Sequence, residues 1–284
     1  MKKLIILIIL IIGCALCFSC STGETHQFLY GISFVSTSDL PIMNDLGIEV
    51  VSQVFPYDGS PQSWLAQLDQ AQNHNIRVIA WLFPQGWEWD GKNWEIDDQS
   101  RSFLQTVSGH PALFAVYALE EPYWQGCWNC GYTTYQQQIL YNKIKEIADV
   151  PIFSDVDSMS FWTAQGEETA FADGICDYCA TWYYPFTVDR YERDKLVQQL
   201  QDDLTVAHER APKSKIVWYI QAFAQNLSGH RMPTEDEMRD VASLVFDSGV
   251  DGAIWYVWTF NSTYDDFLVR HPELFAAVKN VYQK

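Results

Sequence analysis

The chain has 284 residues, of which 48% are hydrophobic and 19% are charged. This composition excludes a disordered chain, and the length suits one large domain or two small ones with an ample core. The formal net charge of −18 excludes nucleic acid as a partner, because an acidic surface repels phosphates, and no basic patch is present for anionic lipid.

The first 19 residues have the pattern of a secretory signal peptide. Two lysines precede the unbroken apolar run Leu4–Ile12, which is too short for a membrane-spanning helix. Cys20 resembles the lipidated cysteine of bacterial lipoproteins, and Cys14 is a second candidate. We expect an exported protein of the cell envelope that contacts the membrane only through a lipid anchor on Cys20. The alternative is plain cleavage and release.

After a short linker, residues 20–27, the chain alternates apolar runs with amphipathic stretches, which predicts alternating strands and helices. The predicted strands are Phe28–Phe34, Ile48–Phe55, Ile76–Phe83, Leu113–Glu121, Ile152–Asp155, Ile175–Tyr183, Ile216–Phe223 and Ala253–Thr259. The predicted helices are Ser60–Asn73, Asp97–Ser108, Thr133–Ala148, Asp189–Glu209, Thr234–Asp247 and His271–Tyr282.

This order predicts an α/β fold, a (β/α)8 TIM barrel formed by residues 28–284 as a single domain. The alternative is a doubly wound open sheet, which the lack of a G-x-G-x-x-G turn after the first strand disfavours. We expect a monomer.

The fourth predicted strand ends in two carboxylates and a proline, Glu120-Glu121-Pro122. Proline lacks an N–H and restricts the residue before it, so the strand stops at Glu121. The loops that follow the strands of a (β/α)8 barrel carry its chemistry. Asp155 and Asp157 end or follow the fifth strand, so they belong to the same face of the barrel.

Nine of the 12 tryptophans fall at or after strand ends, which places them at that same face. Aromatic rings match the apolar faces of sugars, so we expect a cleft that binds carbohydrate. The alternative is that these rings only cover the mouth of the barrel. The candidate aromatic contacts to substrate are Trp81, Trp87, Trp124, Trp182, Tyr183 and Trp258.

Four cysteines follow Cys20, in two C-x-x-C pairs. Two such pairs can form a zinc site, but export favours a disulfide between Cys127 and Cys130. We expect Cys176 and Cys179 to be small buried packing residues, because an odd spacing on a strand points them to opposite faces. The histidines are scattered and no H-E-x-x-H motif occurs, so we predict neither a metal nor a cofactor.

The chain resembles the large clan of (β/α)8 glycoside hydrolases. The resemblance rests on Glu120-Glu121-Pro122 at the end of the fourth strand, Trp258 at the end of the eighth and Tyr183-Tyr184-Pro185 after the sixth. It implies that Glu121 is the acid/base and that Glu120 contacts the sugar. A glutamic acid packed among tryptophans has its pKa raised by desolvation, as a general acid requires.

The chain departs from that clan at the seventh strand. The clan's nucleophile is a glutamate at the strand end, where this chain has Gln221, and a carboxamide cannot serve as that nucleophile. We therefore count Gln221 among the substrate-binding candidates. Three explanations stay open: Asp155 or Asp157 supplies the second carboxylate, the substrate supplies a nucleophile such as an N-acetyl group, or catalysis is lost and the protein only binds glycans.

Overall fold

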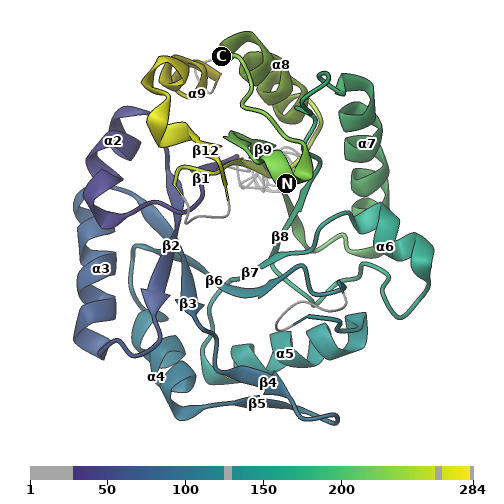
Figure 1. Ribbon diagram of the computed structural model, residues 1–284. Helices are drawn as coiled ribbons and strands as arrows, with labels where there is room; N and C mark the ends of the chain where they lie inside the picture. The colour runs from purple at the N-terminus through teal and green to yellow at the C-terminus, as the bar shows by residue number, and fades with distance from the viewer. Residues whose placement is uncertain (1–27, 125–129, 260–263, 282–284) are drawn as a thin grey trace, which may run out of the picture.

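The computed structural model describes residues 28–124, 130–259 and 264–281. Eight parallel strands close into a barrel in the order β1-β11-β9-β8-β7-β6-β3-β2, and helices surround it (Figure 1). The barrel strands are β1 Leu29–Ile32, β2 Val50–Pro56, β3 Arg77–Phe83, β6 Leu113–Glu120, β7 Ile152–Asp155, β8 Tyr178–Trp182, β9 Lys215–Gln221 and β11 Gly252–Tyr256. The predicted (β/α)8 barrel is confirmed, and the open doubly wound sheet is excluded.

The helices alternate with the strands in sequence, with α9 after the last strand, and they cover the outside of the barrel. They are α2 Leu40–Asp45, α3 Pro61–Asn73, α4 Asp98–Val107, α5 Thr134–Ile147, α6 Met159–Gln165, α7 Arg193–Arg210, α8 Glu235–Phe246 and α9 Phe275–Val281, with the 3-10 helices η1 Thr37–Asp39, η2 Asn226–Ser228, η3 Leu268–Arg270 and η4 Pro272–Leu274. Side-chain hydrogen bonds to the backbone fix where several helices begin. Thr133 and Thr234 each accept a backbone N–H in a capping box, which satisfies an otherwise unpaired donor at the helix end.

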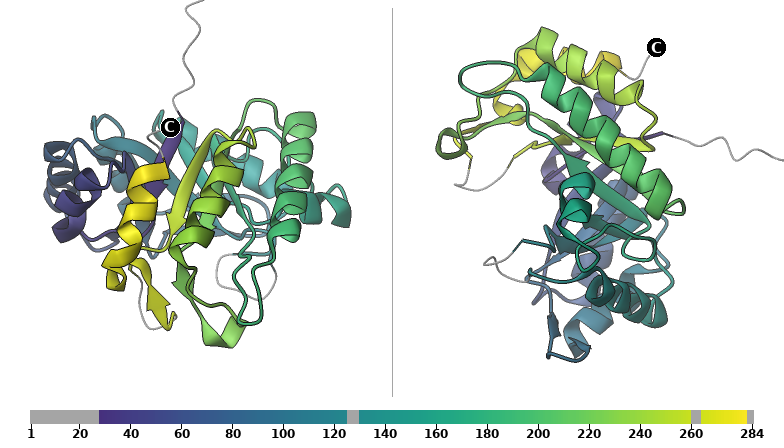
Figure 2. Two further views of the ribbon diagram at one scale, coloured as in Figure 1. Left: turned by 90° about the horizontal axis from the view of Figure 1, so that it is seen from above. Right: turned by 90° about the vertical axis from the view of Figure 1, so that its right-hand side faces the viewer.

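Three features differ from the predicted elements. Helix α2 lies between the first two strands, and the hairpin of β4 Trp87–Trp89 and β5 Trp94–Ile96 follows β3. The predicted strand Ile216–Phe223 divides into β9 and β10 Phe223–Ala224, and β10 pairs with β12 Asp266–Phe267 in antiparallel fashion. Figure 2 shows this small pair at one end of the barrel.

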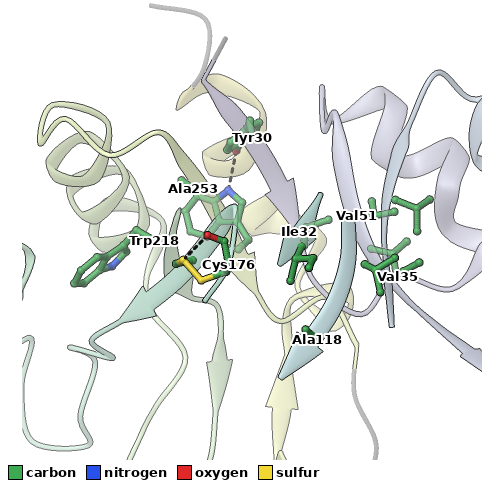
Figure 3. Packing of buried hydrophobic residues seen from close by; sticks show 14 of the residues in the cluster. Tyr30, Ile32, Val35, Val51, Ala118, Cys176, Trp218 and Ala253 are labelled. Atoms are coloured by element: carbon green, nitrogen blue, oxygen red, sulfur yellow. Dashed lines mark hydrogen bonds between the residues drawn. A yellow bond between two sulfur atoms is a disulfide. The ribbon is translucent and has the colours of Figure 1, made fainter. Parts of the chain in front are cut away.

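Side chains of the strands alternate between two buried layers, as the pleat of a strand requires. We call the layer inside the barrel the inner core; Trp81, Tyr117, Tyr219 and Tyr256 belong to it, and its many aromatic rings set it apart. The outer core lies between the barrel and the helices. Figure 3 shows part of the outer core, where the indole N–H of Trp255 donates to the Tyr30 hydroxyl at 2.7 Å.

Cys176 and Cys179 form a buried disulfide, with 5.6 Å between their Cα atoms (Figure 3). The prediction that they are separate packing residues is wrong, because β8 begins at Tyr178. Cys176 therefore precedes the strand, and strand alternation does not separate the two side chains. Cys130 is disulfide-bonded, while its predicted partner Cys127 lies outside the described residues, as does the predicted signal segment with Cys14 and Cys20.

None of the helices described has the length and apolar character needed to cross a membrane. Within the same ranges, no group of three or more histidine, cysteine, aspartate or glutamate side chains is arranged to hold a metal ion.

Candidate active site

The structure brings the predicted carboxylates together at the C-terminal ends of β6 and β7. Glu120 lies opposite Asp155 in the parallel ladder between these strands. The backbone N–H of Glu121 donates to the carbonyl oxygen of Asp155 at 2.8 Å. Asp157 follows two residues later, so four carboxyl groups from two neighbouring strand ends share one region; we call them the carboxyl cluster.

The backbone at this end of the barrel adopts uncommon conformations. Glu121 and Asp157 have φ values of +43° and +58°, and Phe34, just beyond β1, has +57°. A non-glycine residue held in this left-handed region costs on the order of 1–3 kcal/mol, and such residues concentrate at functional sites. These three residues each lie one or two positions after a barrel strand, where the sites of (β/α)8 barrels are built.

Glu121 has the environment of a general acid. Its side chain is half-buried, and burial, helped by the negative charges of Asp157 and Glu120, raises its pKa from the usual 4.5 to about 7. A large fraction of Glu121 is therefore protonated at neutral pH, unlike an ordinary glutamate. Glu120 is the most exposed of the four, and desolvation still raises its pKa.

The two aspartates differ from one another. Asp155 is 6% exposed, and burial together with the charges of Glu121 and Glu120 raises its pKa well above the usual range. The Tyr117 hydroxyl donates to its Oδ2 at 3.4 Å. Asp157 is partly exposed, and burial raises its pKa.

Two indoles hold Asp157 in place. The Nε1 groups of Trp124 and Trp162 donate to its Oδ2 at 2.9 and 3.3 Å. These hydrogen bonds favour the ionised form of Asp157 and oppose the effect of burial on its pKa. Asp157 is therefore the member of the cluster whose charged form the protein stabilises most directly by hydrogen bonding.

Five tyrosines lie beside the carboxyl cluster, and of these the sequence singled out only Tyr184. Tyr117, Tyr219 and Tyr256 belong to the inner core, Tyr184 and Tyr264 pack against it, and Tyr264 donates to the Tyr256 hydroxyl at 3.0 Å. Burial raises the pKa of all five hydroxyls, and the carboxylates add to the effect. Strand alternation is the signal that points Tyr117, Tyr219 and Tyr256 inward.

Only some of the predicted aromatic contacts face this region. Trp81 is 8% exposed and stacks on Tyr117, Trp182 is partly exposed, and Trp124 is 46% exposed. Trp87 and Trp258 are completely buried.

The predicted substrate contacts of Trp87 and Trp258 are therefore wrong. The indole N–H of Trp87 donates to the carbonyl oxygen of Ala118, and that of Trp258 donates to Asp39. Both rings belong to the buried outer core and offer no surface to a ligand. Trp94 is buried as well, and Trp128 lies outside the described residues.

Tyr183 is also displaced from the candidate site. Its ring packs against the outer core and its hydroxyl donates to Glu192. The next residue, Tyr184, packs against the inner core, with its ring 6.1 Å from that of Trp182. Because neighbouring residues in extended chain point in opposite directions, Tyr184 replaces Tyr183 among the candidate binding residues.

Gln221 is completely buried, so the prediction that it contacts substrate is wrong. Its Oε1 accepts the backbone N–H of Phe186 at 3.0 Å. Its Nε2 lies 3.1 to 3.3 Å from the carbonyl oxygens of Arg231, Phe223 and Phe186. The side chain therefore braces the loops after β8 and β9 and has no polar atom left for a ligand.

A closed parallel barrel with carboxyl and aromatic side chains at the C-terminal ends of its strands defines a (β/α)8 barrel with its candidate site in the usual place. No family model matches the sequence, and no curated protein matches it. Solved structures do match the fold, and among them are two mannanases and an endoglucanase.

A β-1,4-mannanase from Aplysia kurodai has a TM-score of 0.58 and 14% identity, over 90% of this chain and 93% of that one. An endoglucanase from Pseudomonas stutzeri has a TM-score of 0.57 and 15% identity, over 89% of this chain and 93% of that one. An endo-β-1,4-mannanase from Thermotoga petrophila has a TM-score of 0.57 and 11% identity, over 91% of this chain and 77% of that one. The chain thus has the (β/α)8 architecture of glycoside hydrolases, and at these identities the likeness concerns the fold.

Proposed function

We propose that this protein is an exported glycoside hydrolase with Glu121 as its general acid. The observation that carries the proposal is the position of Glu121, half-buried beside Glu120 and Asp155 just after the C-terminal end of β6, where burial raises its pKa to about 7. Glycoside hydrolysis needs one protonated carboxyl group to assist the leaving group and one ionised carboxylate. Glu121 is half protonated near neutral pH and lies among other carboxyl groups, so this pair of states is available in one site.

The other members of the carboxyl cluster take separate roles in this proposal. Asp157 supplies the ionised carboxylate, because the indoles of Trp124 and Trp162 favour its charged form. Asp155 is buried, its pKa is raised by burial and by the charges of Glu121 and Glu120, and it does not reach the substrate. Glu120 is exposed and contacts the sugar. The half-exposed rings of Trp124 and Trp182 offer faces on which sugar rings stack.

A second candidate function is glycan binding without catalysis. The observation that favours it is Gln221, whose side-chain amide is hydrogen-bonded to backbone groups. Gln221 occupies the strand end at which the clan that this chain resembles has its nucleophile. Under this alternative the aromatic rings and Glu120 hold the ligand, and no bond is broken.

Replacing Glu121 by glutamine separates the two functions. The amide keeps the shape of the side chain but cannot donate an acidic proton. General acid catalysis contributes about 10²–10⁴-fold, so hydrolysis of glycosides with poor leaving groups should fall by about that factor in Glu121→Gln. Aryl glycosides with activated leaving groups need little proton assistance, so their loss should be smaller. Steady-state rates on both substrate types measure the contrast.

The exposed acid Asp58, in the turn after β2, provides the matched control. Asp58→Asn should keep wild-type rates on both substrate types. Wild-type rates in Glu121→Gln on unactivated glycosides would show that Glu121 is not the acid. A wild-type protein that binds an oligosaccharide but cleaves none of a broad panel would establish the binding function instead.

A further inference from the structure

A pocket of about 430 Å³ lies at the C-terminal ends of β1 and β2, and none of its lining residues belongs to the carboxyl cluster. We call it the side pocket. It is lined by residues 34–37 after β1, Val54 of β2, Gln67 of α3 and Thr259 after β11. The pocket is open to solvent, since Val54 in its wall is 43% exposed.

The side pocket is uncharged and largely apolar. Among the residues that the structure describes, no charged side chain lines it, although the chain has 18 basic and 36 acidic residues. Its apolar side chains are Phe34, Val35 and Val54. Thr37 and Thr259 are partly exposed and offer hydroxyl groups to a ligand. This lining suits an uncharged group that is mostly apolar and needs only a few hydrogen bonds.

Phe34 joins the side pocket to the mouth of the barrel. Its ring packs against those of Trp81 and Tyr256 in the inner core, with 5.5 and 5.8 Å between ring centroids. Trp81 in turn stacks on Tyr117, whose hydroxyl donates to Asp155. The side pocket and the carboxyl cluster therefore border one continuous set of aromatic rings, so that one substrate molecule can contact both.

Val54 points to the same side of the sheet as these rings. The ladder between β2 and β3 places Val54 opposite Trp81, and residues opposite each other in a ladder point to the same face. Because Trp81 belongs to the inner core, Val54 faces the inside of the barrel and not the helices. Its exposed methyl groups are therefore available to a ligand at the mouth of the barrel.

Hydrogen bonds to β2 hold the wall of the side pocket in place. Phe34 has a φ of +57°, a conformation that is costly for a residue other than glycine. Its backbone N–H donates to the hydroxyl of the buried Ser52 at 2.9 Å, and the N–H of Val35 donates to the Ser52 carbonyl oxygen at 3.1 Å. The wall is therefore formed before a ligand binds, which lowers the entropic cost of binding.

We propose that the side pocket binds an apolar substituent of the substrate, a methyl or acyl group on a sugar unit at the mouth of the barrel. This inference rests on the proposed function and names its substrate class, an uncharged deoxy or acylated glycan. The substituent replaces water on Phe34, Val35 and Val54, while the sugar oxygens accept from Thr37 and Thr259. A hydroxyl group in the same place binds less well, because apolar contacts replace its hydrogen bonds to water.

Methyl glycosides of glucose, mannose and galactose test the inference, each as the parent sugar, the 6-deoxy sugar and the singly O-acetylated esters. Dissociation constants would be measured by ligand-observed NMR on the purified protein. In at least one series a deoxy or acetylated sugar should bind about fourfold more tightly than its parent, the gain from burying one methyl group. Salt at about 1 M, where the Debye length is about 3 Å, should not reduce this ratio, because apolar contacts do not depend on charge.

Two exposed valines show whether the preference comes from the side pocket. Val54→Thr replaces a methyl group by a hydroxyl group of similar size and should reduce the preference at least about twofold. Val54→Asp places a charge in the pocket and should abolish the preference. Val188, 59% exposed in the loop after β8, is the control. Val188→Thr and Val188→Asp should both keep the preference of the wild type.

The outcomes separate this inference from the proposed function. Equal affinities of every substituted sugar and its parent would overturn the inference, as would no binding of any compound or a preference that Val54→Asp leaves unchanged. Hydrolysis of glycosides without such a preference overturns this inference alone. A preference that depends on Val54, without hydrolysis of any glycoside in a broad panel, overturns only the catalytic proposal.

Discussion

At the scale of single residues, Gln221 decides which catalytic arrangements are open to this barrel. Its Nε2 has two hydrogens and faces three carbonyl oxygens, while its Oε1 accepts from Phe186. The end of the seventh barrel strand therefore holds two loops together. This structural role explains why a glutamine is present there, and any second carboxylate has to come from another part of the chain.

Replacing Gln221 by glutamate should destabilise the protein without raising hydrolysis. The change removes both donors and turns a buried negative charge toward carbonyl oxygens, so we expect a loss of about 3 kcal/mol in the free energy of unfolding. Chemical denaturation at neutral pH measures it. Gln201→Glu, on the exposed face of α7, is the control and should change little. A Gln221→Glu protein of unchanged stability and higher activity would contradict this account.

The sequence predicts which loops carry the site better than it predicts which side chains face a ligand. The positions of Glu120, Glu121 and Asp155 are predictable because these residues lie at strand ends. There the alternation of side chains along the strand, together with Pro122, fixes their placement. Trp87, Trp258 and Tyr183 lie beyond strand ends, and there the direction of a side chain depends on what packs beneath the loop. The sequence pattern contains no information on that packing.

At the scale of elements, α7 holds the loop that carries Asp157. Asp203 of α7 is completely buried, and it accepts the Thr181 hydroxyl of β8 at 2.5 Å and the backbone N–H of Ser160 at 2.7 Å. The amide of Gln199 donates to the same carboxylate at 2.9 Å. Since Ser160 lies three residues after Asp157, this one carboxylate links β8, α6 and α7 behind the carboxyl cluster.

Asp203→Asn should loosen that loop. The neutral amide loses the charge-assisted hydrogen bonds that the carboxylate accepts, which costs about 1–3 kcal/mol. We expect a lower melting temperature and faster amide hydrogen exchange in residues 158–165. Asp202→Asn changes the exposed neighbour on the same helix and should alter neither quantity. Unchanged exchange in Asp203→Asn would mean that the loop is held by other contacts.

Elements built from local signals are predictable, and elements built from distant pairing are not. Apolar periodicity predicts the strands. Capping residues close in sequence predict the starts of α3, α4, α5 and α8. The β10–β12 pair forms only because the chain beyond β11 returns to the end of β9. No residue in either two-residue strand indicates that pairing.

At the scale of the whole molecule, repetition makes the fold predictable. Eight apolar strands separated by amphipathic segments have few compact solutions, and a closed parallel barrel is one of them. The N-terminal segment lies outside the described residues, so export remains a proposal based on the apolar run and Cys20.

The mature protein should begin at a diacylated Cys20 and partition with membranes. Mass spectrometry of the native N-terminus identifies the modified residue. Cys20→Ser should prevent acylation, whereas Cys14→Ser should leave it unchanged because Cys14 would be removed with the signal segment. An unmodified N-terminus beyond Cys20 would contradict the lipid anchor.

The central claim is that Glu121 remains protonated up to neutral pH, and its titration tests that claim most directly. Carbon-13 NMR of the glutamate carboxyl carbons, compared between the wild type and Glu121→Gln, isolates the signal of this one residue. The account predicts a glutamate that titrates at about 7 and is absent from the variant. A signal lost in the variant that titrates near the ordinary 4.5 would contradict it, because Glu121 would then be ionised at neutral pH and unable to act as the acid.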